Sequence, residues 1–270
     1  MTTPLHRQPT FYLPHGGGPC FFMENTRGPA DMWDRMAAFL RGLIATLDVR
    51  PKAVVVVSGH WEEALFAVNT AARPPLLFDY YGFPEHTYRL QYPVPGSPAL
   101  AKTVRDLLEG AGLATSEDAE RGLDHGVFVP FLLVLPDADV PIVEISLRAD
   151  LDPAAHLRAG AALAPLRDEG VLIVGTGMSY HNMRGFGAAA AEPSKRFDRW
   201  LTDAVTAPSA SARNHALVAW EQAPAGRASH PREEHLLPLM VAAGAALDDL
   251  GNKVFEDQVL GATVSAFRFG

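Results

Sequence analysis

The chain has 270 residues, of which 48% are hydrophobic and 20% are charged, and its formal net charge is −8. This length and composition suit one large α/β domain or two small ones, with ample apolar surface for a core. The single cysteine, Cys20, excludes a disulfide framework and any cysteine-rich zinc or iron–sulfur site. The acidic balance argues against a nucleic-acid-binding protein, and no apolar run reaches the roughly 18 residues that a membrane-spanning helix needs. Because residues 1–9 lack the apolar core of a secretory signal, we expect a cytoplasmic protein.

Short, continuous apolar runs predict the strands of a mostly parallel sheet, because strands covered on both faces need no polar alternation. These runs are Thr10–Leu13, Ala53–Ser58, Leu65–Asn69, Pro141–Ser146 and Val171–Gly175, followed by a closing pair at Lys253–Phe255 and Thr263–Phe269. Periodic patterns between them predict helices over Asp31–Leu47, Ser97–Gly112, Pro153–Glu169, Ser194–Thr206 and Pro231–Ala246. The expected N-caps are Asp31, Ser97 and Asp152. This alternation predicts a single α/β domain over residues 1–270, with helices on both faces of the sheet.

Three of the ten histidines lie at or shortly after the ends of predicted strands. His15 follows the first strand and precedes three glycines, His60 follows Ser58-Gly59, and His181 comes shortly after Val171–Gly175. Each histidine alone could be a turn or solvent-exposed residue. Parallel strands, however, deliver their carboxyl ends to one edge of a sheet, where sites of α/β proteins assemble. The sequence therefore predicts that these three imidazoles converge there.

Two more histidines lie in patterned surroundings. His125 stands between Asp124, which could orient it, and an apolar run. His235 follows a proline and two glutamates that are typical of a helix start, so we expect it in a first helical turn; the alternative is a surface helix. Pro238 predicts that this helix is irregular near His235. His156, in an amphipathic pattern, is expected at the surface.

Several neutral imidazoles at one sheet edge suit a borderline divalent metal such as iron(II), zinc or copper. Histidines outside the ligand set can move protons near neutral pH. Spacing alone cannot choose among the nearby carboxylates, which are Glu62, Glu63, Glu233 and Glu234. The Gly-x-Ser-x-Gly motif of serine hydrolases is missing. The aromatic segment 71–96 is expected to be an ordered loop that either walls a substrate pocket or forms a separate hydrophobic cluster.

A set of short motifs occurs in a specific order along the chain. They are Pro14-His15-Gly16-Gly17-Gly18-Pro19, Val57-Ser58-Gly59-His60-Trp61, Tyr92-Pro93-Val94-Pro95-Gly96, Leu123-Asp124-His125-Gly126, His181-Asn182-Met183 and Glu234-His235-Leu236-Leu237-Pro238-Leu239. Together they resemble the class III extradiol ring-cleavage dioxygenases of the LigB superfamily, in the branch similar to 4,5-DOPA dioxygenase. The resemblance runs from about Phe11 to the C-terminus.

The resemblance implies a non-haem iron(II) centre that cleaves a DOPA-like or related catechol with O2 to a muconic semialdehyde. His15, His60 and His235 match the metal-ligand positions, and the third of these is a glutamate elsewhere in the superfamily. An all-nitrogen site also suits zinc, which leaves the metal open. His181 matches the catalytic base and is a possible fourth ligand, and His125 matches a second active-site histidine. The alternatives are a zinc-dependent hydrolase or amidase and a non-catalytic metal-binding member of the fold.

Overall fold

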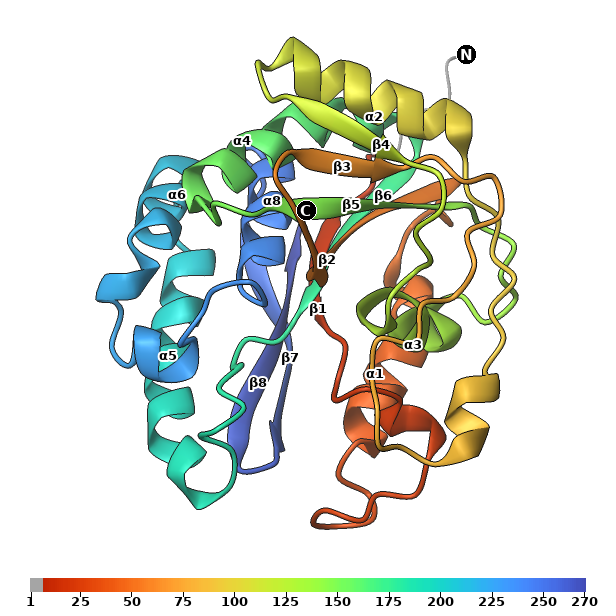
Figure 1. The fold of residues 1–270 in the computed structure, drawn as a ribbon. Helices are drawn as coiled ribbons and strands as arrows, with labels where there is room; N and C mark the ends of the chain where they lie inside the picture. The colour runs from red at the N-terminus through yellow and green to blue at the C-terminus, as the bar shows by residue number, and fades with distance from the viewer. Residues whose placement is uncertain (1–6) are drawn as a thin grey trace.

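Eight strands form one sheet in the computed structural model, which describes residues 7–270 (Figure 1). The strands are β1 (Thr10–Pro14), β2 (Ala53–Glu63), β3 (Phe66–Asn69), β4 (Thr115–Asp118), β5 (Ile142–Arg148), β6 (Val171–Gly177), β7 (Gly251–Val259) and β8 (Ala262–Phe269). The α-helices are α1 (Asp34–Gly42), α2 (Pro98–Gly110), α3 (His125–Val134), α4 (Pro153–Leu163), α5 (Ala191–Val205), α6 (Ala210–Val218), α7 (Gly226–Ser229) and α8 (Leu237–Ala245). The expectation that residues 1–9 contain no secretory signal falls mostly on residues 1–6, which lie outside the described part of the chain. Within residues 7–270, no helix is long and apolar enough to cross a membrane.

The strand order is β4-β3-β5-β2-β6-β1-β8-β7. At its centre, β5, β2, β6 and β1 run parallel, whereas β8 pairs antiparallel with β1 and β7 pairs antiparallel with β8. Residues 54–57 of β2 are all buried, as a central strand covered on both faces requires. The predicted α/β class with a mostly parallel sheet is therefore confirmed.

Helices cover both faces of the sheet, as predicted. On one face α4, α5, α6 and α8 enclose a hydrophobic cluster that includes Phe197 and Met240 (Figure 1). On the other face α1 and α3 enclose a second cluster, which includes Leu40 and Phe128. The central strands are thus covered on both faces, and their ends remain the place for a ligand site.

Several local predictions hold and others are wrong. Ser97 and Asp152 cap α2 and α4 through their side chains, as expected. Asp31 is not an N-cap, because α1 begins at Asp34 after a residue whose side chain makes no capping bond. Helix α3 has no counterpart in the predicted helices, since nine of its ten residues are buried and its sequence lacks a polar face.

The segment before α8 lies directly on the sheet. A methyl group on Gly175 would stand 2.1 Å from the carbonyl oxygen of Pro238, and one on Gly177 would stand 2.1 Å from that of His235. Only glycine permits this approach of backbone to strand. The two glycines of β6 therefore determine how deeply the chain around His235 enters the molecule.

Candidate metal and catalytic site

Five of the predicted histidines meet at the carboxyl ends of β1, β2 and β6. Ligand nitrogens of His15, His60 and His235 all lie within 4.8 Å of one another. The Nε2 atoms of His60 and His235 are 3.1 Å apart, and the ring centroids of His15 and His60 are 4.8 Å apart. His125 lies 4.0 Å from His60, and His181 stacks on His235 at 3.4 Å, both measured between ring centroids. The predicted convergence of imidazoles thus exists in the fold.

The three inner histidines, His15, His60 and His235, are positioned by three different parts of the fold. His15 follows β1, and its backbone N–H donates to the Gly177 carbonyl, which prolongs the β1–β6 pairing. His60 lies inside β2, where the register with β5 is irregular between Val57 and Glu62, an arrangement that can redirect a side chain. The carbonyl of His235 accepts hydrogen bonds from the buried Tyr12 hydroxyl (2.6 Å) and from the Met178 amide (3.3 Å). Three separate elements therefore hold the cluster.

Hydrogen bonds to Nδ1 assign the tautomer of two of these imidazoles. His15 Nδ1 donates to the Gly16 carbonyl at 2.9 Å, and His235 Nδ1 lies 3.0 Å from the Glu234 carboxylate. Their Nε2 atoms consequently carry the lone pairs. Nε2 of His15 is buried without a hydrogen-bond partner among the described residues, a costly state unless it binds something.

Two carboxylates stand behind the histidines. Oε1 of Glu234 accepts from Nδ1 of both His181 (2.9 Å) and His235 (3.0 Å). Oδ1 of Asp79 accepts from both Nδ1 (2.8 Å) and the backbone N–H (3.0 Å) of His125. The other Asp79 oxygen lies 3.8 Å from Nδ1 of His60. Carboxylates in this position orient imidazoles for metal binding and proton transfer.

Burial and mutual proximity keep the inner imidazoles neutral. The pKa values of His15, His60 and His235 lie well below the ordinary value, first because burial disfavours the cation and then because neighbouring histidines repel a charge. The carboxylates behave oppositely. Burial is the largest single influence and acts to raise the pKa of Glu234, but its hydrogen bond to His181, a backbone hydrogen bond and the nearby Arg232 together outweigh burial and lower it. For Asp79 the same competition, with His125 as partner, also ends in a lowered pKa.

The donor set fits a divalent metal ion. Imidazole nitrogens bound tetrahedrally at about 2.1 Å from one ion stand about 3.4 Å apart. The 3.1 Å between His60 and His235, and the 4.8 Å limit for all three residues, lie on either side of that value. His15, His60 and His235 can therefore hold one ion with small side-chain movements. A second grouping, His181 with Glu234 and His235, shares a residue with the first.

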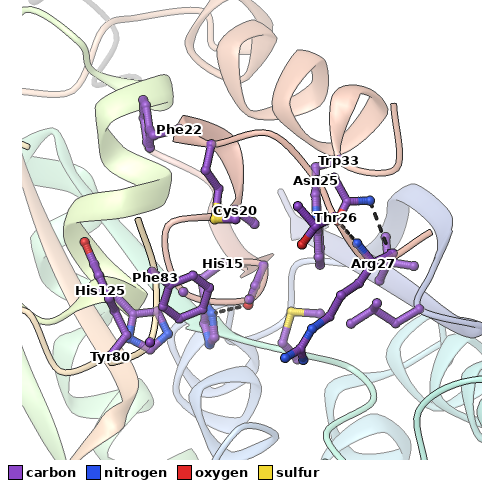
Figure 2. Close-up of a pocket in the computed structure, with 18 of the residues that line it drawn as sticks. His15, Cys20, Phe22, Asn25, Thr26, Arg27, Trp33, Tyr80, Phe83 and His125 are labelled. Atoms are coloured by element: carbon purple, nitrogen blue, oxygen red, sulfur yellow. Dashed lines mark hydrogen bonds between the residues drawn. The ribbon is translucent and has the colours of Figure 1, made fainter. Parts of the chain in front are cut away.

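A cavity of about 1310 Å³ opens over the histidines (Figure 2). Its floor includes His15 and His125, and its walls come from the glycine loop after β1, the segment 22–27 and the aromatic loop. Tyr80 and Phe83 of that loop lie close to His125 in Figure 2. Tyr92 instead packs in the core and donates to the Leu135 carbonyl. The aromatic segment thus forms both a pocket wall and part of a hydrophobic cluster.

Two predicted details of the site are wrong. His235 does not lie in a first helical turn, because residues 231–236 form turns and α8 begins at Leu237, with Pro238 in its first turn. Asp124 does not orient His125; it accepts from the Gly126 amide and the Ser58 hydroxyl at 2.9 and 2.8 Å. The residue that does orient His125 is Asp79, which the sequence analysis missed.

Comparison with known proteins places the chain among ring-opening dioxygenases. The model of the LigB family, described as the catalytic LigB subunit of aromatic ring-opening dioxygenase, matches residues 9–268. A 4,5-DOPA dioxygenase extradiol from Beta vulgaris is 41% identical over 73% of this chain and 74% of its own length. A second protein named 4,5-DOPA dioxygenase extradiol, from Escherichia coli K12, is 34% identical over 88% of this chain and 85% of its own length.

Two further comparisons extend over nearly the whole chain. A protein named dioxygenase tasH, from Hapsidospora irregularis, is 34% identical over 100% of this chain and 87% of its own length. The crystal structure of an uncharacterized Escherichia coli K12 protein has a TM-score of 0.78 at 29% identity. That match covers 98% of this chain and 100% of the solved chain.

Proposed function

The chain belongs to the LigB family of aromatic ring-opening dioxygenases, and from this premise we propose that it cleaves the ring of a catechol with O2 in the extradiol manner. The proposal takes residues 1–270 as one catalytic domain. The observation that carries it is the buried Nε2 of His15, which has no hydrogen-bond partner within residues 7–270, beside the Nε2 atoms of His60 and His235. Such a set of neutral nitrogens at the floor of a cavity is suited to a metal ion with open coordination positions.

His15, His60 and His235 would hold the metal, and His181 is a possible fourth ligand because its ring stacks on that of His235. We expect iron(II) in the active protein, although zinc fits the same all-nitrogen set. When bound, iron(II) would supply Lewis acidity to the two catechol hydroxyls and a path for electrons to O2. The remaining chemistry falls to the side chains.

His181 is proposed as the base that takes a proton from a catechol hydroxyl. Its Nδ1 donates to Glu234, so its Nε2 has the lone pair that can accept the proton. The ionised Glu234 then stabilises the imidazolium that forms. His125 is held by Asp79 in the same way and is proposed as the second proton-transfer group, on the opposite side of the ligand cluster.

The cavity walls supply the ring-binding surface. Tyr80 and Phe83 meet nearly perpendicularly, with centroids 5.4 Å apart, and both line the cavity beside His125. A planar catechol can contact such rings by edge or face while they exclude water. Extradiol cleavage breaks the ring bond beside the two hydroxyl-bearing carbons and places both atoms of one O2 in the product, so the product would be a muconic semialdehyde and no external reductant is needed.

The test is anaerobic reconstitution of the metal-free protein with iron(II), followed by oxygen uptake with DOPA, caffeate and protocatechuate. We expect one O2 consumed per catechol, a yellow product, and both atoms of labelled O2 in that product. A zinc-dependent hydrolase, for which these catechols offer no ester or amide bond, and a non-catalytic metal-binding protein would both leave oxygen uptake at the background rate. Absence of oxygen uptake with all three catechols would therefore overturn the proposal.

A further inference from the structure

One cation lines the cavity apart from the histidines. Among the described residues around the cavity, Arg27 is the only arginine or lysine. It belongs to the segment 22–27, on the wall across from Tyr80 and Phe83, and in Figure 2 its side chain stretches from that wall toward the middle of the cavity. The guanidinium group is therefore presented to whatever occupies the space above His15.

Local hydrogen bonds fix the backbone that carries Arg27. The Asn25 side chain accepts from the Arg27 amide (3.2 Å) and donates to the Pro29 carbonyl (2.6 Å). This is an Asx-type turn, which orders the loop without using the Arg27 side chain. Asn25 and Thr26 line the same cavity, so the turn itself forms part of the wall.

The Arg27 guanidinium makes no ion pair or hydrogen bond with any residue between 7 and 270, although Glu24 lies on the same wall. The arginines nearest the histidine cluster differ in this respect. Arg121 pairs with the buried Asp124 at 3.1 Å, and Arg232 pairs with Glu62. The only free guanidinium at the site is thus the one that faces the cavity, among the residues that the structure describes.

We propose that Arg27 determines specificity: its guanidinium binds a carboxylate on the side chain of the catechol and so selects anionic over uncharged catechols. This inference rests on the proposed function for the catechol end of the ligand. A guanidinium group matches a carboxylate with two parallel hydrogen bonds, and it makes the strongest such contact when no protein carboxylate competes. The histidines would fix the diol, and Arg27 would select the substituent.

The test compares two catechols on the iron-loaded protein: 3-(3,4-dihydroxyphenyl)propionate, which has the carboxylate, and 4-methylcatechol, which lacks it. For Arg27→Ala we expect KM for the propionate to rise about 10-fold, with kcat and the KM for 4-methylcatechol within about twofold of the unaltered protein. Arg27→Lys keeps the positive charge but loses the pair of parallel N–H donors, so its KM for the propionate should lie between those of the unaltered protein and Arg27→Ala. Arg41→Ala, at an exposed position of α1, is the matched control and should leave KM and kcat unchanged for both catechols.

A second measurement does not depend on turnover. Calorimetric titration with 3-phenylpropionate, which has the carboxylate but no hydroxyls, should give binding to the iron-loaded protein that Arg27→Ala weakens by a similar factor and that added salt weakens further. If the unaltered protein cleaves neither catechol, the proposed function fails, and this titration alone decides the role of Arg27. If Arg27→Ala changes both catechols equally, or leaves 3-phenylpropionate binding unchanged, the inference about Arg27 is wrong.

Discussion

The carboxylate of Glu234 is the most revealing group to remove, because one oxygen atom serves two histidines. Its Oε1 accepts from His181 at 2.9 Å and from His235 at 3.0 Å, and its side chain is only 13% exposed. A hydrogen bond to a charged group contributes about 1.5–3 kcal/mol, and loss of a carboxylate that orients a metal-binding histidine costs about 10- to 100-fold in metal affinity. We therefore expect Glu234→Ala to weaken metal binding about 100-fold, near the upper end of that range because both bonds disappear.

The conservative variant separates charge from geometry. Glu234→Gln keeps an oxygen that can accept both bonds but removes the negative charge, so we expect about a 10-fold loss. Glu233→Gln is the matched control: its carboxylate pairs with Arg227 at 2.5 Å and contacts neither histidine. Its metal affinity should stay within about twofold of the unaltered protein.

The assay is a competition titration of metal-free protein against a chromophoric chelator, first with zinc and then anaerobically with iron(II). Thermal unfolding of each metal-free variant checks that the fold is retained. An affinity of Glu234→Ala within twofold of that of Glu233→Gln would refute the reasoning, because it would mean that the two histidines need no common acceptor.

Three further predictions test the other residues. His181→Ala should keep the metal, measured by elemental analysis, but lose about 10²- to 10⁴-fold in kcat as expected for a proton-transfer group; near-normal turnover would exclude it as the base. His15→Ala should lose the metal, whereas His86→Ala, whose imidazole lines the cavity but bonds the Phe22 carbonyl, should retain it; equal metal content in the two variants would contradict the assignment. His156 is buried with a pKa of about 4, so between pH 6.5 and pH 5 its imidazole becomes protonated in the unfolded chain but stays largely neutral in the native protein, and its contribution to the free energy of unfolding should fall by about 1.5 kcal/mol. Other buried histidines, such as His15 and His235, add losses of the same sign, so urea unfolding at both pH values should show a fall that is smaller in His156→Leu than in the unaltered protein by about 1.5 kcal/mol. Parallel pH dependences of the two proteins would disprove the contribution of His156.

The arrangement of the histidines was predictable from the sequence because it follows from strand direction. His15 and His60 come at or near the ends of apolar runs that had to be parallel central strands, and such ends share an edge. The position of His235 was not predictable in the same way. Pro231 and the two glutamates resemble a helix start, but the segment forms turns instead, pressed against the glycines of β6. That contact joins residues about sixty positions apart, and no local pattern encodes it.

The carboxylate that orients His125 left no signal in the sequence. Asp79 stands 46 residues before its partner, in a loop without periodicity, whereas Asp124 stands beside His125 and attracts the simpler interpretation. His156 shows the same limit for burial. Its helix, α4, packs against α8, and its ring centroid lies 5.2 Å from that of Phe66, so the expected surface position is wrong. In both cases the deciding neighbour comes from a distant part of the chain.

The charges of the site are separated into layers, and this separation bears on its chemistry. The proposed ligands are neutral imidazoles, and the negative charges of Asp79 and Glu234 lie behind histidines. A divalent ion at the centre would therefore meet no anionic protein ligand, which favours an anionic diol over water at its open positions. The same carboxylates are placed where they stabilise His125 and His181 once these have accepted protons. The site thus keeps negative charge away from the substrate position and next to the proposed proton carriers, which is what deprotonation of a bound catechol requires.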